Sequence, residues 1–244
     1  MGIPKREKAL NSQSVIVQIP IQKCCDWQGF TYTKEGWHYL CETMKQVEDN
    51  PNLKYKDSIL ARFYTNYQPT SLMECLLEQE DGKNSSSTEQ WEPLPWRVSI
   101  NIPEGNNQHF GPNHERFGER QLQRIISVYK AVKQKGYHPA KYKDGYVRGY
   151  FLKKPGDYRY YRFLITAGQH RMAALAVLGY KDVIVRLQPR QKRVITMKEV
   201  EKWPQVINGT YDKETARRIF QSYFKNNGSE KAEALGLLHR KAKN

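Results

Sequence analysis

Residues 165–174, with the sequence ITAGQHRMAA, constrain the fold more than any other stretch of this chain. Residues 158–165 are aromatic and β-branched with interspersed arginines, which predicts a strand. Residues 172–178 are rich in Ala and Leu and are followed by Gly179, which predicts a helix that ends there. The residues from Gly168 to Arg171 therefore form a turn that joins a strand to a helix.

A turn of this kind suits an anion. The N-terminus of a helix presents unpaired backbone N–H groups and the positive end of the helix dipole. Gly168 lets a ligand approach the backbone, and the side chains of His170 and Arg171 add hydrogen-bond donors. The sequence therefore predicts a phosphate-binding turn. The same residues also fit a structural turn in which His170 is a buried side chain and Arg171 a solvated charge.

The motif Gly-x-His-Arg followed by Ala-Ala, between a strand and a helix, resembles the signature of the ParB/sulfiredoxin superfamily. The resemblance covers about residues 108–190 and does not extend to the first hundred residues. It implies an α+β fold, with a small mixed sheet and packed helices, preceded by an N-terminal α/β extension. It also implies that Gly168, Gln169, His170 and Arg171 hold the phosphates of a nucleotide.

The branches of the superfamily imply different activities. The sulfiredoxin branch uses a Cys between the Gly and the His, where this chain has Gln169, so sulfinic acid reduction is not expected. The kinase branch implies a transferase that moves a phosphoryl group from ATP or ADP to a small-molecule or sugar hydroxyl, with Mg²⁺ as cofactor. The partition branch implies a nucleic-acid-binding or nuclease-like protein controlled by CTP. A regulatory module that binds a nucleotide without turnover is a further alternative.

A long amphipathic helix is predicted for residues 117–135, with Gly136 as its stop. In the superfamily a helix like this precedes the nucleotide turn, and acidic and Arg residues near its start face the ligand. The candidate catalytic residues are therefore Glu119, Glu115 and His114, with His109 as a further base. The candidate cations for substrate or phosphate are Arg124, Arg162 and Arg148. A Glu in the first turn of a helix is also favourable without any function, and no metal ligand is assigned.

Charge is distributed unevenly along the chain. Residues 1–122 hold 13 Lys+Arg and 16 Asp+Glu, a net charge of −3, and residues 123–244 hold 27 and 9, a net charge of +18, which together give the +15 of the whole chain. A half this basic attracts polyanions, so nucleic acid is a candidate partner beside a nucleotide and its acceptor. The mean hydropathy of −0.81 and the lack of a long apolar run predict no membrane span. No secretory signal is recognisable, which predicts a cytoplasmic protein with four free cysteines.

Three segments are predicted: an N-terminal extension of unassigned role (residues 1–105), a nucleotide-binding core (106–190) and a C-terminal helical segment (191–244). A hairpin of residues 145–152 and 158–165 is expected to lead into the turn, and residues 183–187 to return as a strand after the helix. A further strand is expected at residues 14–20. Further helices are expected at 37–47, at 58–64, after a cap at Thr70 or Ser71, starting at 196 or 197, and at 211–224. The irregular segments expected are a mobile loop at 80–89, a turn at 203–209 and a frayed tail from 226. Trp91 and Trp96 are expected to pack, or alternatively to line a pocket.

Overall fold

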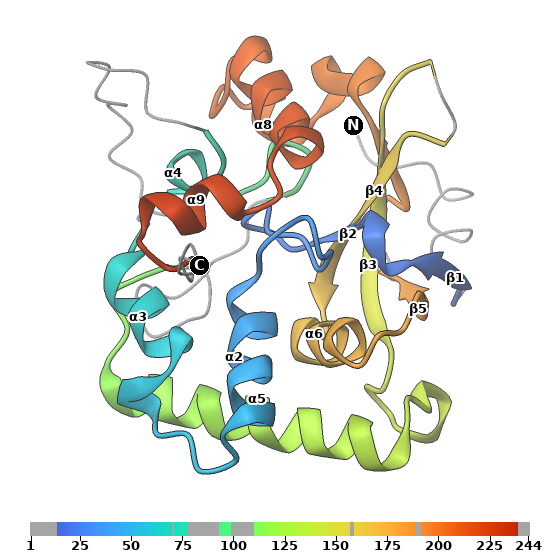
Figure 1. The fold of residues 1–244 in the computed structure, drawn as a ribbon. Helices are drawn as coiled ribbons and strands as arrows, with labels where there is room; N and C mark the ends of the chain where they lie inside the picture. Colours follow the sequence, from blue (N-terminus) through green and yellow to red (C-terminus); the bar gives the residue numbers. More distant parts are fainter. Residues whose placement is uncertain are drawn as a thin grey trace.

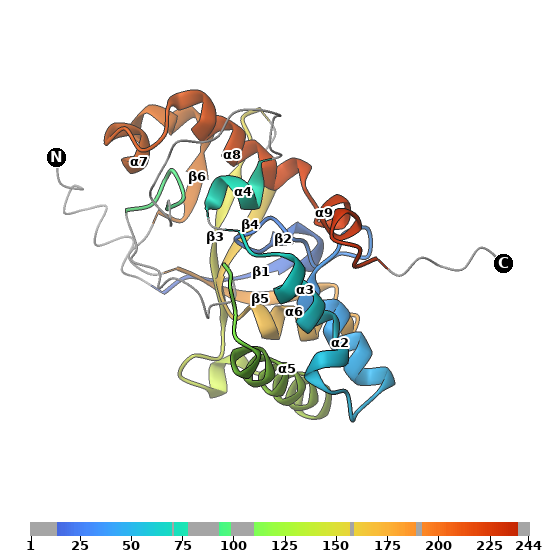
Figure 2. The same cartoon turned by 90° about the vertical axis from the view of Figure 1, so that its left-hand side faces the viewer.

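Apolar side chains alternate along the strands, and the part of the sheet around β3 and β4 is buried on both faces. The computed structural model describes residues 14–69, 71–77, 93–98, 110–156, 159–188 and 192–238. In β5 (Asp182–Leu187), Val183, Val185 and Leu187 are buried on one face. In β3 (Val147–Lys153), Tyr150 and Leu152 are buried on the other face. The sheet therefore lies between two layers of helices, as Figures 1 and 2 show.

The strands form one mixed sheet in the order β1-β5-β3-β4-β2, and β6 also pairs with β3. Besides β3 and β5, the strands are β1 (Ile16–Pro20), β2 (Cys24–Cys25), β4 (Tyr161–Ala167) and β6 (Val194–Thr196). The pairs β3–β4 and β1–β5 are antiparallel, whereas β5 and β6 run parallel to successive parts of β3. The sheet confirms the α+β class with a mixed sheet.

Helices cover the two faces of the sheet separately (Figure 2). On one face lie α6 (Gln169–Val177) and α2 (Tyr39–Asp49), with α5 (Glu115–Lys135) packed on these two helices, and on the other face lies α8 (Lys213–Lys225). The remaining helices are α3 (Ile59–Asn66), α4 (Leu72–Leu76), α7 (Pro204–Ile207) and α9 (Ser229–Ala234). Short 3-10 helices are η1 (Ile21–Lys23), η2 (Tyr55–Asp57), η3 (Pro139–Lys141) and η4 (Met197–Lys202).

Most elements expected from the sequence are present, with boundaries shifted by a few residues. The hairpin is β3 and β4, and the strand after the turn is β5, which pairs with β3 rather than with β4. Ser71 caps α4 and Asp212 caps α8, each by accepting from a backbone N–H three residues later. Trp96 is buried and donates from Nε1 to the Tyr150 hydroxyl at 2.9 Å, which confirms its packing role. Trp91 and residues 80–89 lie outside the described residues.

The C-terminal segment is more ordered than the sequence suggested. The prediction of a frayed tail from residue 226 is wrong as far as residue 238, because α9 forms there and Ala232 and Leu237 are fully buried. The helix expected from residue 196 or 197 is the 3-10 helix η4, preceded by the unexpected strand β6. The turn expected at residues 203–209 contains α7. Short apolar runs such as 194–196 carry little periodic signal, and only pairing with β3 makes them strands.

The sheet draws on all three segments expected from the sequence. Residues 1–105 contribute β1 and β2, residues 106–190 contribute β3, β4 and β5, and residues 191–244 contribute β6. Strand β1 pairs along its whole length with β5, from Ile16 opposite Arg186 to Pro20 opposite Asp182. The N-terminal residues therefore complete the sheet that carries the turn at residues 168–171.

Candidate functional site

The turn between β4 and α6 presents a helix N-terminus with open donors. Gly168 is the N-cap of α6, and no side chain caps the helix. The backbone N–H groups of Gln169, His170 and Arg171 have no intrahelical acceptor, and no other described residue accepts from them. Three donors and the positive end of the α6 dipole thus face the same place, where an anion is favoured.

Gly168 is required by the geometry of this turn. Its φ of +87° lies in the left-handed region. A Cβ atom there would lie 3.1 Å from Val147 Cα and 3.3 Å from Arg171 Nη2. A larger residue would therefore strain the backbone and push on the arginine beside it. Helix α6 begins at Gln169, three residues earlier than the sequence suggested, because Gly168 turns the chain directly into it.

His170 is buried, with 5% of its surface exposed, and its Nε2 atom has no hydrogen-bond partner among the described residues. Burial, and to a smaller extent the charges of Arg124 and Arg171, together lower the pKa of His170 to about 3. The imidazole is therefore neutral at physiological pH. An anion beside Arg124 and Arg171 would offset the repulsion and make protonation easier.

Arg171 and Arg186 meet at Tyr146. Arg171 is half-buried and donates from Nη2 to the carbonyl oxygen of Tyr146 at 3.3 Å. The guanidinium of Arg186 lies 4.3 Å from the centre of the Tyr146 ring. The Nε atoms of both arginines are buried without a partner in the described part of the chain. Each guanidinium therefore retains donor capacity for a ligand.

Arg148 and Arg124 extend this group of cations. Arg148 is opposite Ala167 of β4 and beside Arg186 of β5, so the sheet register brings it to the end of β4. Arg124 and Arg148 both lower the pKa of Arg171 by charge repulsion, although burial of Arg171 is the larger cause. We call Arg124, Arg148, Arg171 and Arg186 the arginine cluster. Asp144 lies beside it, with Oδ1 4.0 Å from Arg148 Nη2.

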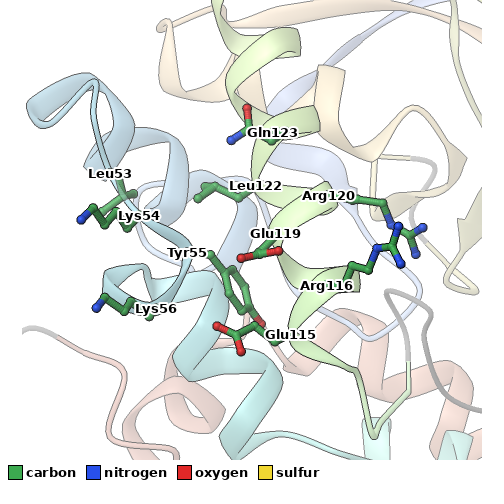
Figure 3. A pocket seen from close by; sticks show the side chains of 10 residues that line it. All are labelled: Leu53, Lys54, Tyr55, Lys56, Glu115, Arg116, Glu119, Arg120, Leu122 and Gln123. Carbon is green, nitrogen blue, oxygen red and sulfur yellow. The ribbon is translucent and has the colours of Figure 1, made fainter.

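The structure places Glu115 and Glu119 on another side of α5. They line an open pocket of about 810 Å³ between η2 and the first half of α5 (Figure 3). Both carboxylates point toward Tyr55 and raise its pKa, second to the effect of its burial. At about 100° per residue, Glu119 and Arg124 are separated by about 140° around the helix. The two glutamates are therefore not brought together with the arginine cluster.

The remaining candidates also lie apart from the turn. Arg162 is near the start of β4, where Nε donates to Tyr223 O at 3.2 Å and Nη1 to Gln22 O at 3.0 Å. Since Gly168 follows the other end of β4, about 20 Å of extended chain separates them, and Arg162 joins neighbouring segments instead. His114 is exposed and precedes α5, and His109 lies outside the described residues.

A buried acid–histidine pair was missed by sequence reasoning. Asp26 Oδ2 lies 3.5 Å from His38 Nε2, and Asp26 Oδ1 accepts from the backbone N–H of Phe30 at 2.9 Å. Burial raises the pKa of Asp26 to about 7 and lowers that of His38 to about 3, with a smaller lowering from His170. The two residues lie 12 apart in a stretch that mixes aromatic and polar residues, so no spacing marks them as partners.

Asp144, Tyr146 and Arg186 were also missed, because only the strand register and the loop before β3 bring them to the turn. The four cysteines are confirmed as free thiols, and all are buried. Among the described residues, no three His, Cys, Asp or Glu side chains are grouped as metal ligands would be. No helix in the described ranges has both the length and the apolar character that crossing a membrane requires.

Comparisons with protein-family models, with curated proteins and with solved structures find no match for this chain. The kind of ligand that this site suits is therefore inferred from the chemistry of its own residues. The site is a helix N-terminus with N–H groups that no described residue accepts from, and Arg124 and Arg171 lie near enough to His170 of its first turn to lower its pKa.

Proposed function

We propose that this chain binds a nucleotide through its phosphate groups at the N-terminus of α6. The observation that carries the proposal is the combination of the open N–H groups of residues 169–171 with Arg171 in the same helical turn and Arg124 and Arg148 near it. Four guanidinium groups beside one carboxylate leave an excess of positive charge. A polyphosphate offers several negative charges and many acceptor oxygens, and arginine matches phosphate geometry with paired hydrogen bonds.

We further propose that the bound nucleotide is ATP or ADP and that the chain is a phosphotransferase acting on a small-molecule or sugar hydroxyl. This part rests on the resemblance to the kinase branch of the ParB/sulfiredoxin superfamily. The acceptor oxygen would attack the terminal phosphorus, the bond from phosphorus to the leaving nucleotide would break, and the hydroxyl proton would pass to a base. The arginine cluster would stabilise the charge that develops on the transferred group.

The side chains around the turn at residues 168–171 suit phosphate groups better than a metal site made only of protein ligands. Within the described ranges no group of three His, Cys, Asp or Glu is placed to hold Mg²⁺. Mg²⁺ typically takes its ligands from substrate phosphates, one or two carboxylates and water. Asp144 is the carboxylate that the structure sets beside the arginine cluster, so it joins Glu119 and Glu115 as a candidate base or metal ligand.

Calorimetric titration with ATP, ADP and CTP, each with Mg²⁺, tests the binding proposal. The informative variant is Arg124→Ala, because Arg124 is exposed and its loss should not disturb folding. Arg116→Ala is the matched control, since Arg116 is an exposed arginine of the same helix that extends away from Tyr55 in Figure 3 and is not part of the arginine cluster. We expect Arg124→Ala and His170→Ala to weaken binding and Arg116→Ala to leave it unchanged. No binding of any of the three nucleotides would overturn the proposal.

Turnover separates a phosphotransferase from a module that only binds. If the chain releases ADP from ATP in the presence of hydroxyl compounds, Asp144→Asn should stop turnover and spare nucleotide binding. Glu119→Gln, on the far side of α5 from Arg124, is the comparison. A loss confined to Glu119→Gln would move the base to the pocket of Figure 3, and nucleotide binding without turnover would favour the regulatory module.

A second candidate function is nucleic-acid binding, which the +18 charge of residues 123–244 favours. A nucleic-acid-binding protein of this kind would show a strong dependence of DNA affinity on salt, because each neutralised phosphate releases counterions. CTP preferred over ATP and ADP in the titration would also point to the partition-like alternative.

A further inference from the structure

A second cavity lies away from the arginine cluster, where the N-terminal and C-terminal parts of the chain meet. Its volume is about 760 Å³, within the range of small-molecule sites. Its described walls come from the loop after β2, the end of α3, α4, the end of α8, and α9. Phe30, Leu76, Leu77 and Leu235 make part of the lining apolar. Figure 1 shows α9 lying between α3, α4 and α8 in the chain fold.

Lys231 of α9 supplies a half-buried positive charge to this cavity, which the exposed Lys225 also lines. Its Nζ donates to the carbonyl oxygen of Cys75 and to the hydroxyl of Tyr67. It also lies 4.8 Å from the centre of the Tyr67 ring and 6.0 Å from that of Phe30. An ammonium group has three N–H donors, so two neutral acceptors leave one for a ligand.

The ammonium group of Lys231 has no counter-ion in direct contact among the residues that the structure describes. No carboxylate of a described residue lies within 4.0 Å of Lys231 Nζ, although Glu74 and Glu230 also line the cavity. Burial lowers the pKa of Lys231, and the more distant Cys75 and Asp26 offset this only in part. A half-buried charge of this kind is stabilised by an anion that supplies a charge-assisted hydrogen bond.

We propose that this cavity binds a small carboxylic acid with an apolar body. The carboxylate would accept a hydrogen bond from Lys231 Nζ, and the apolar body would lie against Phe30, Leu76 and Leu77. Lys231 Nζ can pair with one carboxylate, and the apolar walls match a hydrocarbon or aromatic group rather than a bare inorganic anion. The proposal is independent of nucleotide binding, because it uses none of the residues of the turn.

Calorimetry with 3-phenylpropionate and with its uncharged isostere 3-phenylpropanamide tests the role of the charge on the unmodified protein. We expect the acid to bind at least about tenfold more tightly than the amide, since the amide carbonyl can accept from Lys231 but carries no charge to pair with it. Inorganic phosphate is the third probe and should bind more weakly at this cavity than the acid. Equal binding of acid and amide, or no binding of the acid at millimolar concentration, would overturn the proposal.

Two variants locate the site. Lys231→Met keeps the length of the side chain and removes its charge, so we expect binding of the acid to fall at least about tenfold. Lys225→Met removes an exposed lysine that also lines the cavity and should leave binding nearly unchanged. Amide NMR shifts at Gly29 and Gly228, both in the cavity wall, should follow the titration. Shifts at Gly168 instead would place the acid at the arginine cluster and contradict the inference, whether or not Lys231→Met folds.

Discussion

Arg171 is the side chain on which the nucleotide proposal depends most directly at the scale of single residues. It belongs to α6, touches Tyr146 through one nitrogen and keeps a buried Nε without a partner among the described residues. Its place beside Arg124 and Arg148 is unfavourable for the empty site, since like charges repel. A bound polyphosphate would relieve that repulsion, so binding and charge are coupled here.

Arg171→Ala should therefore weaken nucleotide binding. The expected loss is about 1.5–3 kcal/mol, or roughly tenfold to a hundredfold in Kd, because a charge-assisted hydrogen bond and a cation are removed together. Calorimetric titration with the preferred nucleotide measures it, with Arg116→Ala as the control. Unchanged affinity would exclude Arg171 from the phosphate site.

The buried carboxyl group of Asp26 should make the folding stability depend on pH. Its pKa is raised from 3.8 to about 7 in the fold, so between these values the folded chain holds a proton that the unfolded chain has lost. The stability that this proton contributes is complete below pH 4 and is lost as the pH rises through 7. Asp26→Asn removes the dependence, so its stability relative to the unmodified protein should increase with pH, by at most ~4 kcal/mol.

Urea unfolding at pH 4.5 and at pH 7.5 measures this difference. The exposed Asp49→Asn variant is the control and should show little change relative to the unmodified protein. A stability difference for Asp26→Asn that does not vary with pH would contradict the burial of an easily protonated carboxyl group. His170, whose pKa is lowered to about 3, acts in the opposite direction in both proteins and cancels in the comparison.

At the scale of elements, the junction of β4 and α6 carries the site. Gly168 and Gly179 flank α6 with similar left-handed φ values, +87° and +80°. A Cβ at Gly168 would meet Val147 and Arg171, whereas a Cβ at Gly179 would meet nothing within 4 Å. Comparing substitutions at the two glycines therefore distinguishes the effect of backbone strain from the effect of disturbing the turn.

Gly168→Ala and Gly179→Ala should both cost about 1 kcal/mol in folding stability, because a non-Gly residue is unfavourable at positive φ. Only Gly168→Ala should also weaken nucleotide binding, because its methyl group displaces Arg171 or tilts the first N–H groups of α6. Thermal unfolding and calorimetric titration of both variants test this. Equal binding by the two variants would show that the turn does not hold the ligand.

At the scale of the whole molecule, the +18 charge of residues 123–244 has two possible uses. A focused site at α6 uses a few arginines, whereas nucleic acid would contact many cations over the surface. These uses differ in their salt dependence, because the logarithm of affinity for DNA falls in proportion to the number of phosphates neutralised.

We expect mononucleotide affinity to change less than about tenfold between about 50 and 200 mM salt, since only a few charges are involved. Duplex DNA affinity measured in parallel should be weak at the higher salt and insensitive to Arg124→Ala. Tight DNA binding that persists at the higher salt and is lost in Arg124→Ala would favour the nucleic-acid alternative.

The sequence by itself determined the elements whose signals are local. Periodicity predicted α5, aromatic and β-branched residues predicted β4, and capping chemistry placed a helix start at Thr70 or Ser71, of which Ser71 is the cap. The turn at Gly168 was also evident, because a glycine between a strand and a helix is a local signal. These features depend on interactions within a few residues of each other.

Only the tertiary structure decided which distant residues meet. The register of β3 with β5 sets Arg148 beside Arg186, and the packing of α5 turns Arg124 toward the turn and Glu119 away from it. Strand β6 and helix α9 form because neighbouring segments pair with them and bury them. Such contacts join residues far apart in the chain, and their free energy depends on burial and register that no local pattern contains.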